Sequence, residues 1–262
     1  MKQTLAVLIF MTGMISGVYA QETDTAGIKN QVIFRLNKIS DRPDVFNAPY
    51  SNFIIPAVMV SYGLVARRSK SLQKRDHSIN HEISEHLKVT IPIDDYSQYI
   101  PAVAVYGMEL TGMEAKHNFR DRTVIMATSG IIMGATVLTV KSATRIKRPD
   151  GSNNRSFPSG HTAMAFAGAH ILFKEYKDTS PWACITGYAV AAGTGTFRVL
   201  NKKHWVSDVV TGAAIGILSA EMGYLLLPVF HNIFGIKNKN NSPAVAPAIG
   251  ADTYGIGLTY TF

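Results

Sequence analysis

The sequence predicts an all-α protein, a compact bundle of about six helices with a short C-terminal β-strand or hairpin. Three observations carry this prediction. About six apolar segments of helical length follow one another between residues 51 and 235. Small residues recur in the later segments at four-residue spacing, which lets helices pack closely. At 262 residues, 47% of them hydrophobic, the chain is long enough to bury one core.

The N-terminus has the pattern of a secretory signal peptide over residues 1–20. A basic residue precedes an apolar stretch, 5–15, and small residues that end at Ala20. Residues 21–50 are polar and mixed, so we expect a short amphipathic or irregular lead-in. The single cysteine, Cys184, excludes an internal disulfide. An exported chain of this kind depends on packing for its stability.

Residues 51–235 form the predicted helical domain. The expected helices lie within 53–66, 99–113, 123–140, 162–173, 183–197 and 209–230. Among the later helices, the spacings Gly187-x3-Ala191 and Gly212-x3-Gly216 predict close helix contacts. Polar connections separate the segments, and we expect substrate-selecting residues in the loop stretches 81–97 and 150–157.

The lengths of these segments do not decide whether the bundle spans a membrane. A spanning helix needs about 20 apolar residues, and only 123–140 and 209–230 approach that length, the second with Glu221 inside it. Charged residues make up 17% of the chain, below the usual share of about 25%. This low share favours a membrane or a membrane-bound substrate.

Residues 236–262 are predicted to be a linker and a β-like tail. The stretch 238–247 is rich in Asn, Pro and Ala, and after it apolar residues alternate with Gly and Thr. This period of two is typical of a β-strand. The alternating positions are Tyr254, Ile256, Leu258, Tyr260 and Phe262. We expect a single strand, or a hairpin with 245–249, added to the helical domain.

Basic residues and histidines form three short clusters. In the first, Lys141 and Arg148 are seven residues apart, which places both on one face of a predicted helix, and Pro149 ends that helix directly after them. Two cations on one face can reach a single anion.

The second cluster is the run Pro158-Ser159-Gly160-His161. Pro158 and Ser159 are typical of a helix start, so free backbone N–H groups and the positive end of the helix dipole are expected beside His161. An anion is stabilised at such a position.

In the third cluster, Arg198 is followed by His204 and, four residues later, by Asp208. On a helix this spacing lets the carboxylate hold one imidazole nitrogen while the other nitrogen faces a substrate. A nucleophilic or basic histidine needs that orientation. No metal-ligand spacing occurs in the sequence, so we expect neither a metal nor a cofactor.

Together, Lys-x6-Arg-Pro, Pro-Ser-Gly-His and Arg-x5-His-x3-Asp resemble the signature of the type 2 phosphatidic-acid phosphatase and vanadium haloperoxidase superfamily. The motifs occur in the family's order, and the resemblance covers roughly residues 123–230. Each motif alone is weak, but the triplet is specific. The resemblance implies that the domain 51–235 is a helical phosphatase.

The resemblance also implies a role for each motif residue. His204 would attack phosphorus with Asp208 orienting it, and water would hydrolyse the resulting phosphohistidine. His161 would protonate the leaving alkoxide. The groups expected to hold the phosphoryl oxygens are Lys141, Arg148, Ser159, the Gly160 amide and Arg198. This chemistry needs no metal.

One position departs from the family pattern. The family usually has Ser before the arginine of the third motif, and this chain has Phe197. The missing hydroxyl removes one hydrogen bond to phosphate, although Thr194 and Thr196 lie close in sequence. We expect weaker binding with the reaction retained.

Other charged residues and histidines have no motif around them. Arg145 and Arg155 are expected to be solvated. The remaining histidines are interpreted as ordinary surface or core residues: His77, His81, His86, His117, His170 and His231.

The net charge of +8 favours an anionic partner. A phosphorylated lipid or another phosphate ester fits best. Nucleic acid is excluded as a partner because the basic residues are scattered and no nucleic-acid motif is present. The sequence carries no signal for an oligomeric state.

The resemblance and the signal peptide imply an exported protein of the bacterial envelope, associated with the membrane, whose active site faces the periplasm. Residues 67–75 are predicted to form a basic loop after the first segment. This loop conflicts with a periplasmic site, because the positive-inside rule places it in the cytoplasm. If every segment spans, His161 lies in the cytoplasm too. One early segment therefore does not span, with the segment that carries Glu109 as the candidate, or the domain is not multispanning.

The expected substrates are phosphatidic acid, phosphatidylglycerol phosphate, a lipid A phosphate or undecaprenyl pyrophosphate. Three alternatives remain. A soluble periplasmic acid phosphatase of broad specificity fits the signal peptide and the short helices. A vanadium haloperoxidase would hold vanadate at His204, but the chain lacks the extra helical domain typical of those enzymes. A non-catalytic binder of phosphorylated lipid is suggested only by Phe197.

Overall fold

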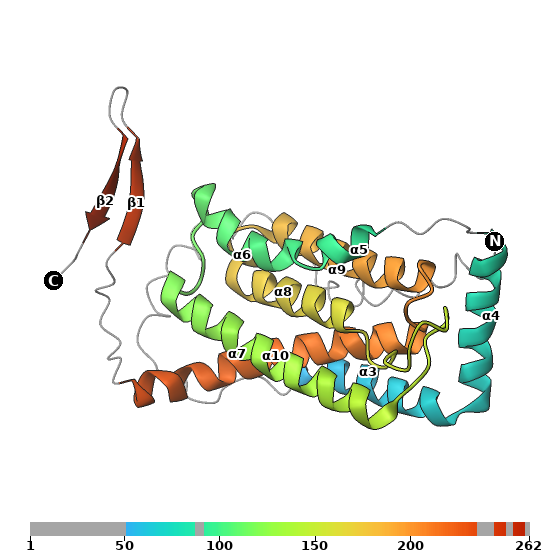
Figure 1. Ribbon diagram of the computed structural model, residues 1–262. Helices are drawn as coiled ribbons and strands as arrows, with labels where there is room; N and C mark the ends of the chain where they lie inside the picture. The colour runs from blue at the N-terminus through green and yellow to red at the C-terminus, as the bar shows by residue number, and fades with distance from the viewer. Residues whose placement is uncertain (1–50, 87–91, 235–243, 250–253, 260–262) are drawn as a thin grey trace, which may run out of the picture.

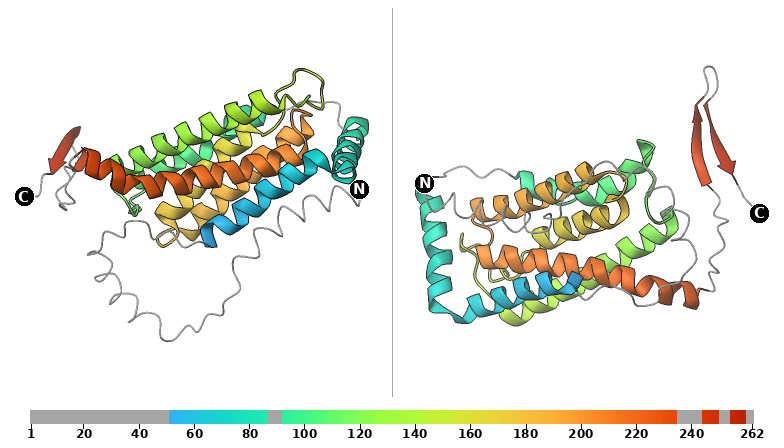
Figure 2. Two further views of the ribbon diagram at one scale, coloured as in Figure 1. Left: turned by 90° about the horizontal axis from the view of Figure 1, so that it is seen from below. Right: turned by 180° about the vertical axis from the view of Figure 1, so that it is seen from behind.

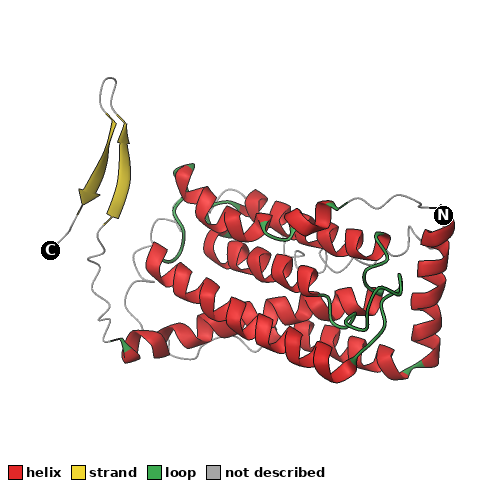
Figure 3. Ribbon diagram, viewed as in Figure 1, coloured by secondary structure: helices red, strands yellow, loops and turns green. Residues whose placement is uncertain are grey.

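The computed structural model describes residues 51–86, 92–234, 244–249 and 254–259, which contain eight helices and two strands. These helices form the bundle expected from the sequence (Figures 1 and 3). The predicted signal peptide, the lead-in and most of the linker before the tail lie outside the described residues. The domain boundaries therefore stay predictions.

Two helices lie at the centre of the bundle. Helix α10 (Val206–Ile233) packs against α3 (Ser51–Arg68), α7 (Phe119–Thr144) and α8 (Gly160–Tyr176). Helix α8 also contacts α9 (Pro181–Leu200) and α6 (Ile100–Leu110). Figures 1 and 2 show these helices running roughly along one direction. The six predicted segments correspond to these six helices.

Local sequence signals explain where several helices begin. The Asn118 side chain accepts the backbone N–H of Asp121 and caps α7, and Pro181 occupies the first turn of α9. Between the helices, two glycines of α10 allow close packing on α8. A Cβ on Gly212 would lie 2.4 Å from the Ser159 carbonyl oxygen, and one on Gly216 would lie 2.3 Å from that of Ala163. The predicted contact at Gly212-x3-Gly216 is confirmed.

Two helices were missed by the sequence analysis. The stretch predicted as a basic loop is helical: Arg67 lies in the last turn of α3, and α4 (Lys70–His86) follows after a one-residue break. Helix α5 (Ile93–Ser97) occupies part of the predicted loop stretch 81–97. Figure 1 shows α4 crossing the end of the bundle. Pattern analysis fails here because α4 is polar along most of its length and α5 is a single turn.

Helices α7 and α10, with 26 and 28 residues, have the length and composition of membrane-crossing helices. Half of the most apolar stretch of α10 is buried among other helices, compared with 22% of that of α7. Large apolar side chains such as Ile131 and Leu138 on α7 are exposed. Helix α6, which carries Glu109, has only 11 residues and is too short to span.

The C-terminal strands pair as an antiparallel ribbon. Strand β1 (Ala244–Ile249) lies beside β2 (Tyr254–Thr259), with Ala244 opposite Thr259 and Ile249 opposite Tyr254. The tail thus has two short strands. The ends of the tail lie outside the described residues.

Candidate active site

The three motifs come together at the end of the bundle that α4 crosses (Figure 1). Lys141 lies in the last turn of α7, and Arg148 lies in the loop that follows. The prediction that both lie on one helical face was wrong. Helix α7 ends at Thr144 because Arg145 adopts a left-handed conformation (φ 48°), and its N–H closes on the Lys141 carbonyl oxygen.

Lys141 and Arg148 still act on the same site. Lys141 interacts electrostatically with Arg148, Asp208 and Arg198. Burial and then the charge of Arg198 lower the pKa of Arg148. The Lys141 ammonium donates to the carbonyl oxygen of Arg155 at 2.7 Å, which fixes the lysine against the loop before α8. The loop brings the two cations together, although the helix does not.

The second motif forms the start of α8, as predicted. Ser159 is the N-cap, and its buried hydroxyl accepts the backbone N–H of Thr162 at 3.4 Å. Gly160 is the first helical residue and His161 the second. The first turn of a helix leaves backbone N–H groups without intrahelical partners, so these amides are suited to an anion.

The third motif joins the end of α9 to the start of α10. Arg198 lies in the last turn of α9, and Asp208 in the first turn of α10, where its Oδ2 accepts the backbone N–H of Trp205 at 3.0 Å. His204 lies in the connecting loop, so the prediction that both members of the pair are on one helix was wrong. Because the Asp208 carboxylate caps the start of α10, it faces the loop that carries His204. His204 Nδ1 lies 3.5 Å from Asp208 Oδ2.

His204 and Asp208 are almost completely buried. Burial lowers the pKa of His204 to about 4, with Lys141 and Arg198 acting in the same direction and Asp208 opposing them. His204 is therefore a neutral imidazole at ordinary pH. A neutral imidazole has a lone pair available for attack.

Two acidic residues on α5 join the site, and the sequence analysis missed both. Asp94 is buried and pairs with Arg198 Nη1 at 2.6 Å, and Asp95 lies 3.3 Å from the same nitrogen. Asp95 also lies 3.1 Å from His161 Nε2. Burial and then Arg198 lower the pKa of His161, and Asp95 opposes them. No sequence signal marked these residues, because they are about 100 positions away from the arginine they contact.

Phe197 and its neighbour Thr194 offer no spare hydroxyl for a phosphate. Phe197 is half-buried on α9. Thr194, considered as a substitute hydroxyl, is buried, donates to the Val190 carbonyl oxygen at 2.9 Å and lies 2.7 Å from the Ser97 hydroxyl. Its hydroxyl is thus already engaged.

The other basic residues and histidines mostly match their predictions. Arg145 and Arg155 are exposed, as are His81 and His86. His117, His170 and His231 pair with Glu175, Glu221 and Asp121. Among the described residues, one group has metal-ligand side chains close together: Glu82, Glu85 and His86 on α4. Their i, i+3 and i+4 spacing on a helix accounts for it.

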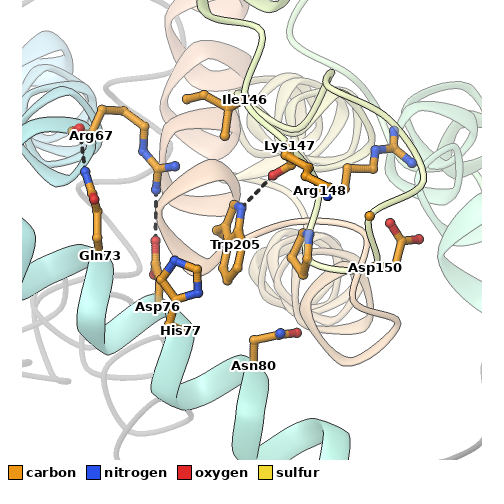
Figure 4. A pocket seen from close by; sticks show the side chains of 12 residues that line it. Arg67, Gln73, Asp76, His77, Asn80, Ile146, Lys147, Arg148, Asp150 and Trp205 are labelled. Atoms are coloured by element: carbon orange, nitrogen blue, oxygen red, sulfur yellow. Dashed lines mark hydrogen bonds and ion pairs between the residues drawn. The ribbon is translucent and has the colours of Figure 1, made fainter.

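A cavity of about 580 Å³ lies beside the site, between α4 and the loop after α7. Arg67, Asp76 and His77 line one side of it, and Arg148 and Trp205 line the other (Figure 4). Trp205 Nε1 donates to the Lys147 carbonyl oxygen at 3.0 Å. The Trp205 and His77 rings pack edge to face, with their centroids 4.5 Å apart.

Comparison with known proteins identifies the part of the chain that carries these motifs. A family model described as the PAP2 superfamily matches residues 123–231. This part of the chain is therefore similar to the PAP2 superfamily. The PAP2 segment contains all three motifs and runs from α7 to α10. Helices α3, α4 and α5 lie before it, so Arg67, Asp76, Asp94 and Asp95 are additions from outside the segment.

Two curated relatives match over shorter stretches. A lipid A 1-phosphatase of Porphyromonas gingivalis is 41% identical over 133 residues, which cover 50% of this chain and 30% of that protein. The bacitracin transport permease protein BcrC of Bacillus licheniformis is 34% identical over 67 residues, covering 26% of this chain and 31% of that one. The matches span about a third of the length of these relatives.

Two solved structures are also similar. The crystal structure of Aquifex aeolicus LpxE aligns with a TM-score of 0.43 at 20% identity, covering 56% of this chain and 93% of that chain. A PAP2 type phosphatidylglycerolphosphate phosphatase from Bacillus subtilis aligns with a TM-score of 0.44 at 18% identity, covering 72% and 98%.

Proposed function

We propose that this protein is a lipid phosphatase that hydrolyses a phosphomonoester or a terminal pyrophosphate through a phosphohistidine on His204. One observation carries the proposal. A buried neutral imidazole, backed by Asp208, lies in a cluster with three cations and a helix N-terminus. This combination provides a nucleophile and charge compensation for the phosphoryl group it attacks.

In the first step, His204 Nε2 attacks phosphorus and the bond to the leaving oxygen breaks. Asp208 Oδ2 lies 3.5 Å from Nδ1 in the resting structure; it accepts the Nδ1–H hydrogen bond as this contact shortens during the reaction, and it stabilises the positive charge that develops on the ring. Lys141, Arg148 and Arg198 stabilise the negative charge on the three phosphoryl oxygens. The Arg198 Nε has no hydrogen-bond partner in the described part of the chain, so this N–H is available to phosphate.

The leaving alkoxide takes a proton from His161. Burial and Arg198 lower the pKa of His161. Asp95, which lies 3.1 Å from Nε2, opposes that shift and favours the charged form that a general acid needs. In the second step, His161 removes a proton from water, the water attacks phosphorus and the N–P bond to His204 breaks. Phosphate leaves, and both histidines return to their starting states.

Three observations favour a lipid substrate. The P. gingivalis relative is a lipid A 1-phosphatase, which supports a lipid phosphate as the substrate class. Apolar side chains are exposed on α3 and α7, and two helices have membrane-crossing composition. We propose that the protein associates with the envelope membrane and that the site faces the periplasm. Phosphatidic acid, phosphatidylglycerol phosphate, lipid A and undecaprenyl pyrophosphate are the candidate lipids.

Phosphate release by the wild type and by His204→Ala tests the proposal on these four lipids and a soluble aryl phosphate. We expect release from at least one lipid and a loss of roughly 10⁴-fold or more in the variant, because no intermediate forms. The matched control is His81→Ala, whose side chain is 75% exposed.

Each other outcome replaces the proposal with a named alternative. Turnover of the aryl phosphate alone would replace the lipid phosphatase by a broad-specificity acid phosphatase. Bromide oxidation that depends on added vanadate would indicate a haloperoxidase. Binding of phosphorylated lipid without turnover would indicate a non-catalytic binder.

A further inference from the structure

Arg67 brings a positive charge to the side of Asp208 that faces away from the histidine contact. Its Nη1 lies 3.8 Å from Asp208 Oδ1. The other carboxylate oxygen, Oδ2, accepts the Ser156 hydroxyl at 2.5 Å and the Trp205 N–H at 3.0 Å, and lies 3.5 Å from His204 Nδ1. Oδ1 is buried and has no hydrogen-bond partner among the described residues. Arg67 is therefore the ion-pair partner of that oxygen.

The guanidinium of Arg67 is itself held in place. Nη2 pairs with Asp76 Oδ2 at 2.9 Å and contacts the Ser207 hydroxyl, which donates to the same carboxylate at 2.5 Å. The Arg67 carbonyl oxygen accepts the Gln73 side-chain amide at 2.6 Å, and the guanidinium lies over the Phe157 ring at 5.5 Å. Figure 4 shows Arg67 directed at Asp76 on α4. A planar group fixed on several sides has a defined direction.

Close packing of α3 on α10 sets where this guanidinium lies. A Cβ on Gly63 would lie 1.8 Å from the Thr211 hydroxyl oxygen, so the two helices touch at this glycine. The helices run in opposite directions (Figure 1). One turn further along α3 is Arg67, and one turn back along α10 is Ser207, which explains their contact. The glycine contact therefore places Arg67 in reach of Asp208.

We propose that Arg67 is a positioning residue for the histidine nucleophile. Anchored by Asp76 and Ser207, it attracts Oδ1 of Asp208 and so fixes the rotation of the carboxylate with Oδ2 facing His204 Nδ1. The fixed carboxylate selects the imidazole tautomer that leaves Nε2 unprotonated for attack. The expected effect of Arg67 on kcat rests on the proposed function. Its effect on the His204 tautomer is a property of the resting protein.

A purely structural role for Arg67, tying α3 and α4 to α10, predicts different measurements. Loss of a tether lowers stability and reduces the amount of folded protein. Loss of a positioning group lowers kcat of the folded protein, and the loss depends on Asp208 being present. The variants are chosen to separate these two results.

The kinetic test compares Arg67→Met, Arg67→Lys and the neighbouring Arg68→Met, whose side chain is exposed. We expect kcat of folded Arg67→Met to fall by about 10–100-fold, the usual effect of removing a group that orients an active residue. KM stays within about twofold because the cations assigned to phosphate remain. Arg67→Lys regains part of the loss, and Arg68→Met matches the wild type. An Arg67→Met protein as active as Arg68→Met would overturn the proposal.

A double-mutant cycle with Asp208→Asn separates positioning from tethering. If Arg67 acts through Asp208, Arg67→Met costs less than about twofold in kcat once the carboxylate is gone. The same 10–100-fold loss in both backgrounds would identify a tether and reject positioning. If Arg67→Met does not fold, the cycle is run with Arg67→Lys, which keeps the charge and loses the planar geometry.

The last measurement does not depend on turnover. Protein labelled with ¹⁵N-histidine reports the tautomer of His204 by NMR, with His204→Gln used to assign the signal. We expect one tautomer, protonated at Nδ1, in the wild type and a mixture in Arg67→Met. If the wild type releases no phosphate, the proposed function fails, and this spectrum still decides the role of Arg67. An unchanged tautomer in Arg67→Met rejects it.

Discussion

Two of the buried charged clusters in this bundle differ in how their polar atoms are paired. In the Glu221 cluster, which is Glu221 with His170 and Lys174, the two carboxylate oxygens lie 2.6 Å from the imidazole and 2.7 Å from the ammonium. In the phosphate-site cluster, several buried polar atoms have no hydrogen-bond partner in the described part of the chain. These are Nε of Arg148 and of Arg198, Nδ1 of His204 and Oδ1 of Asp208.

Both clusters include residues of α8 or α10, so the difference lies in position along the helices. His170 is nine residues beyond His161 on α8, about 13 Å at 1.5 Å per residue. Buried polar groups are usually satisfied, and those that are not often belong to functional sites. We therefore propose that the Glu221 cluster serves stability and that the phosphate-site cluster serves binding. Mutations that separate stability from activity test this division.

The largest effect is expected for Glu221→Ala. Removal of this buried carboxylate leaves Lys174 and His170 without their anion, which costs about 3–5 kcal/mol of unfolding free energy. Chemical denaturation measures the loss, with the 57%-exposed Glu85→Ala as control. Activity per folded molecule should stay within about twofold of the wild type. A variant that keeps its stability and loses activity would move the Glu221 cluster into the functional class.

The next effect is expected for Arg148→Ala. Its guanidinium has no ion pair among the described residues, so its removal should leave stability within about 0.5 kcal/mol of the wild type. The kcat/KM should fall by about 100-fold, or roughly 3 kcal/mol of transition-state stabilisation. Arg145→Ala, an exposed arginine three residues earlier, is the control.

Arg198→Ala sharpens the contrast, because this arginine also neutralises the buried Asp94. It should lose both activity and stability. An active Arg148→Ala or Arg198→Ala enzyme would contradict the assignment of these side chains to phosphate.

The pH dependence should reflect the pKa of His204, which burial lowers to about 4. A histidine in the unfolded chain titrates near 6.5, so between pH 6.5 and 4 the unfolded state binds one more proton. This group therefore costs stability as pH falls through that window, by up to about 3 kcal/mol. Above pH 6.5 it has no effect.

The same pKa predicts that the nucleophile stays neutral in mildly acidic solution. We expect the acid limb of kcat/KM, corrected for substrate ionisation, to lie near pH 4. An acid limb near 6.5 would mean that His204 is hydrated and charged like an exposed histidine. The phosphate-site cluster would then not be a buried site from which water is excluded.

The smallest effect is expected for Phe197→Ser. This substitution restores the hydroxyl usual before the arginine of the third motif, so kcat/KM should stay the same or rise by about tenfold, the lower end of what one hydrogen bond to a charged group contributes. Because Phe197 is half-buried, stability should fall by about 1 kcal/mol. A fall in kcat/KM for the folded variant would show that the aromatic ring supports the site by packing.

Much of the bundle could be predicted, because an apolar segment of helical length indicates a helix that packs in the core. The six segments between 53 and 230 each became a helix, and the cap at Ser159 was visible as Pro-Ser-Gly before an apolar run. Helix ends were less predictable. Arg145 stopped α7 before Pro149, since a left-handed residue ends a helix and carries no sequence signal of its own unless it is Gly or Asn.

The residues of the candidate site were also predicted only in part. The three motifs named His161, His204, Asp208 and the cations, since they are short and local. Arg67, Asp94 and Asp95 were not named, because a charged residue on a polar stretch resembles a solvated one until a distant partner is known. Arg67 was assigned to a basic loop, yet it lies 3.8 Å from a buried carboxylate.

By itself, the sequence determined the helical class, the motif residues and the chemistry that a histidine, a carboxylate and three cations can perform. Those properties depend on residue type and on spacing within a few turns. Only the tertiary structure decided which carboxylates support Arg198 and His161 and which arginine faces Asp208. Packing of α3 and α5 against α9 and α10 sets those contacts, and a contact between residues 100 positions apart depends on the path of the whole chain.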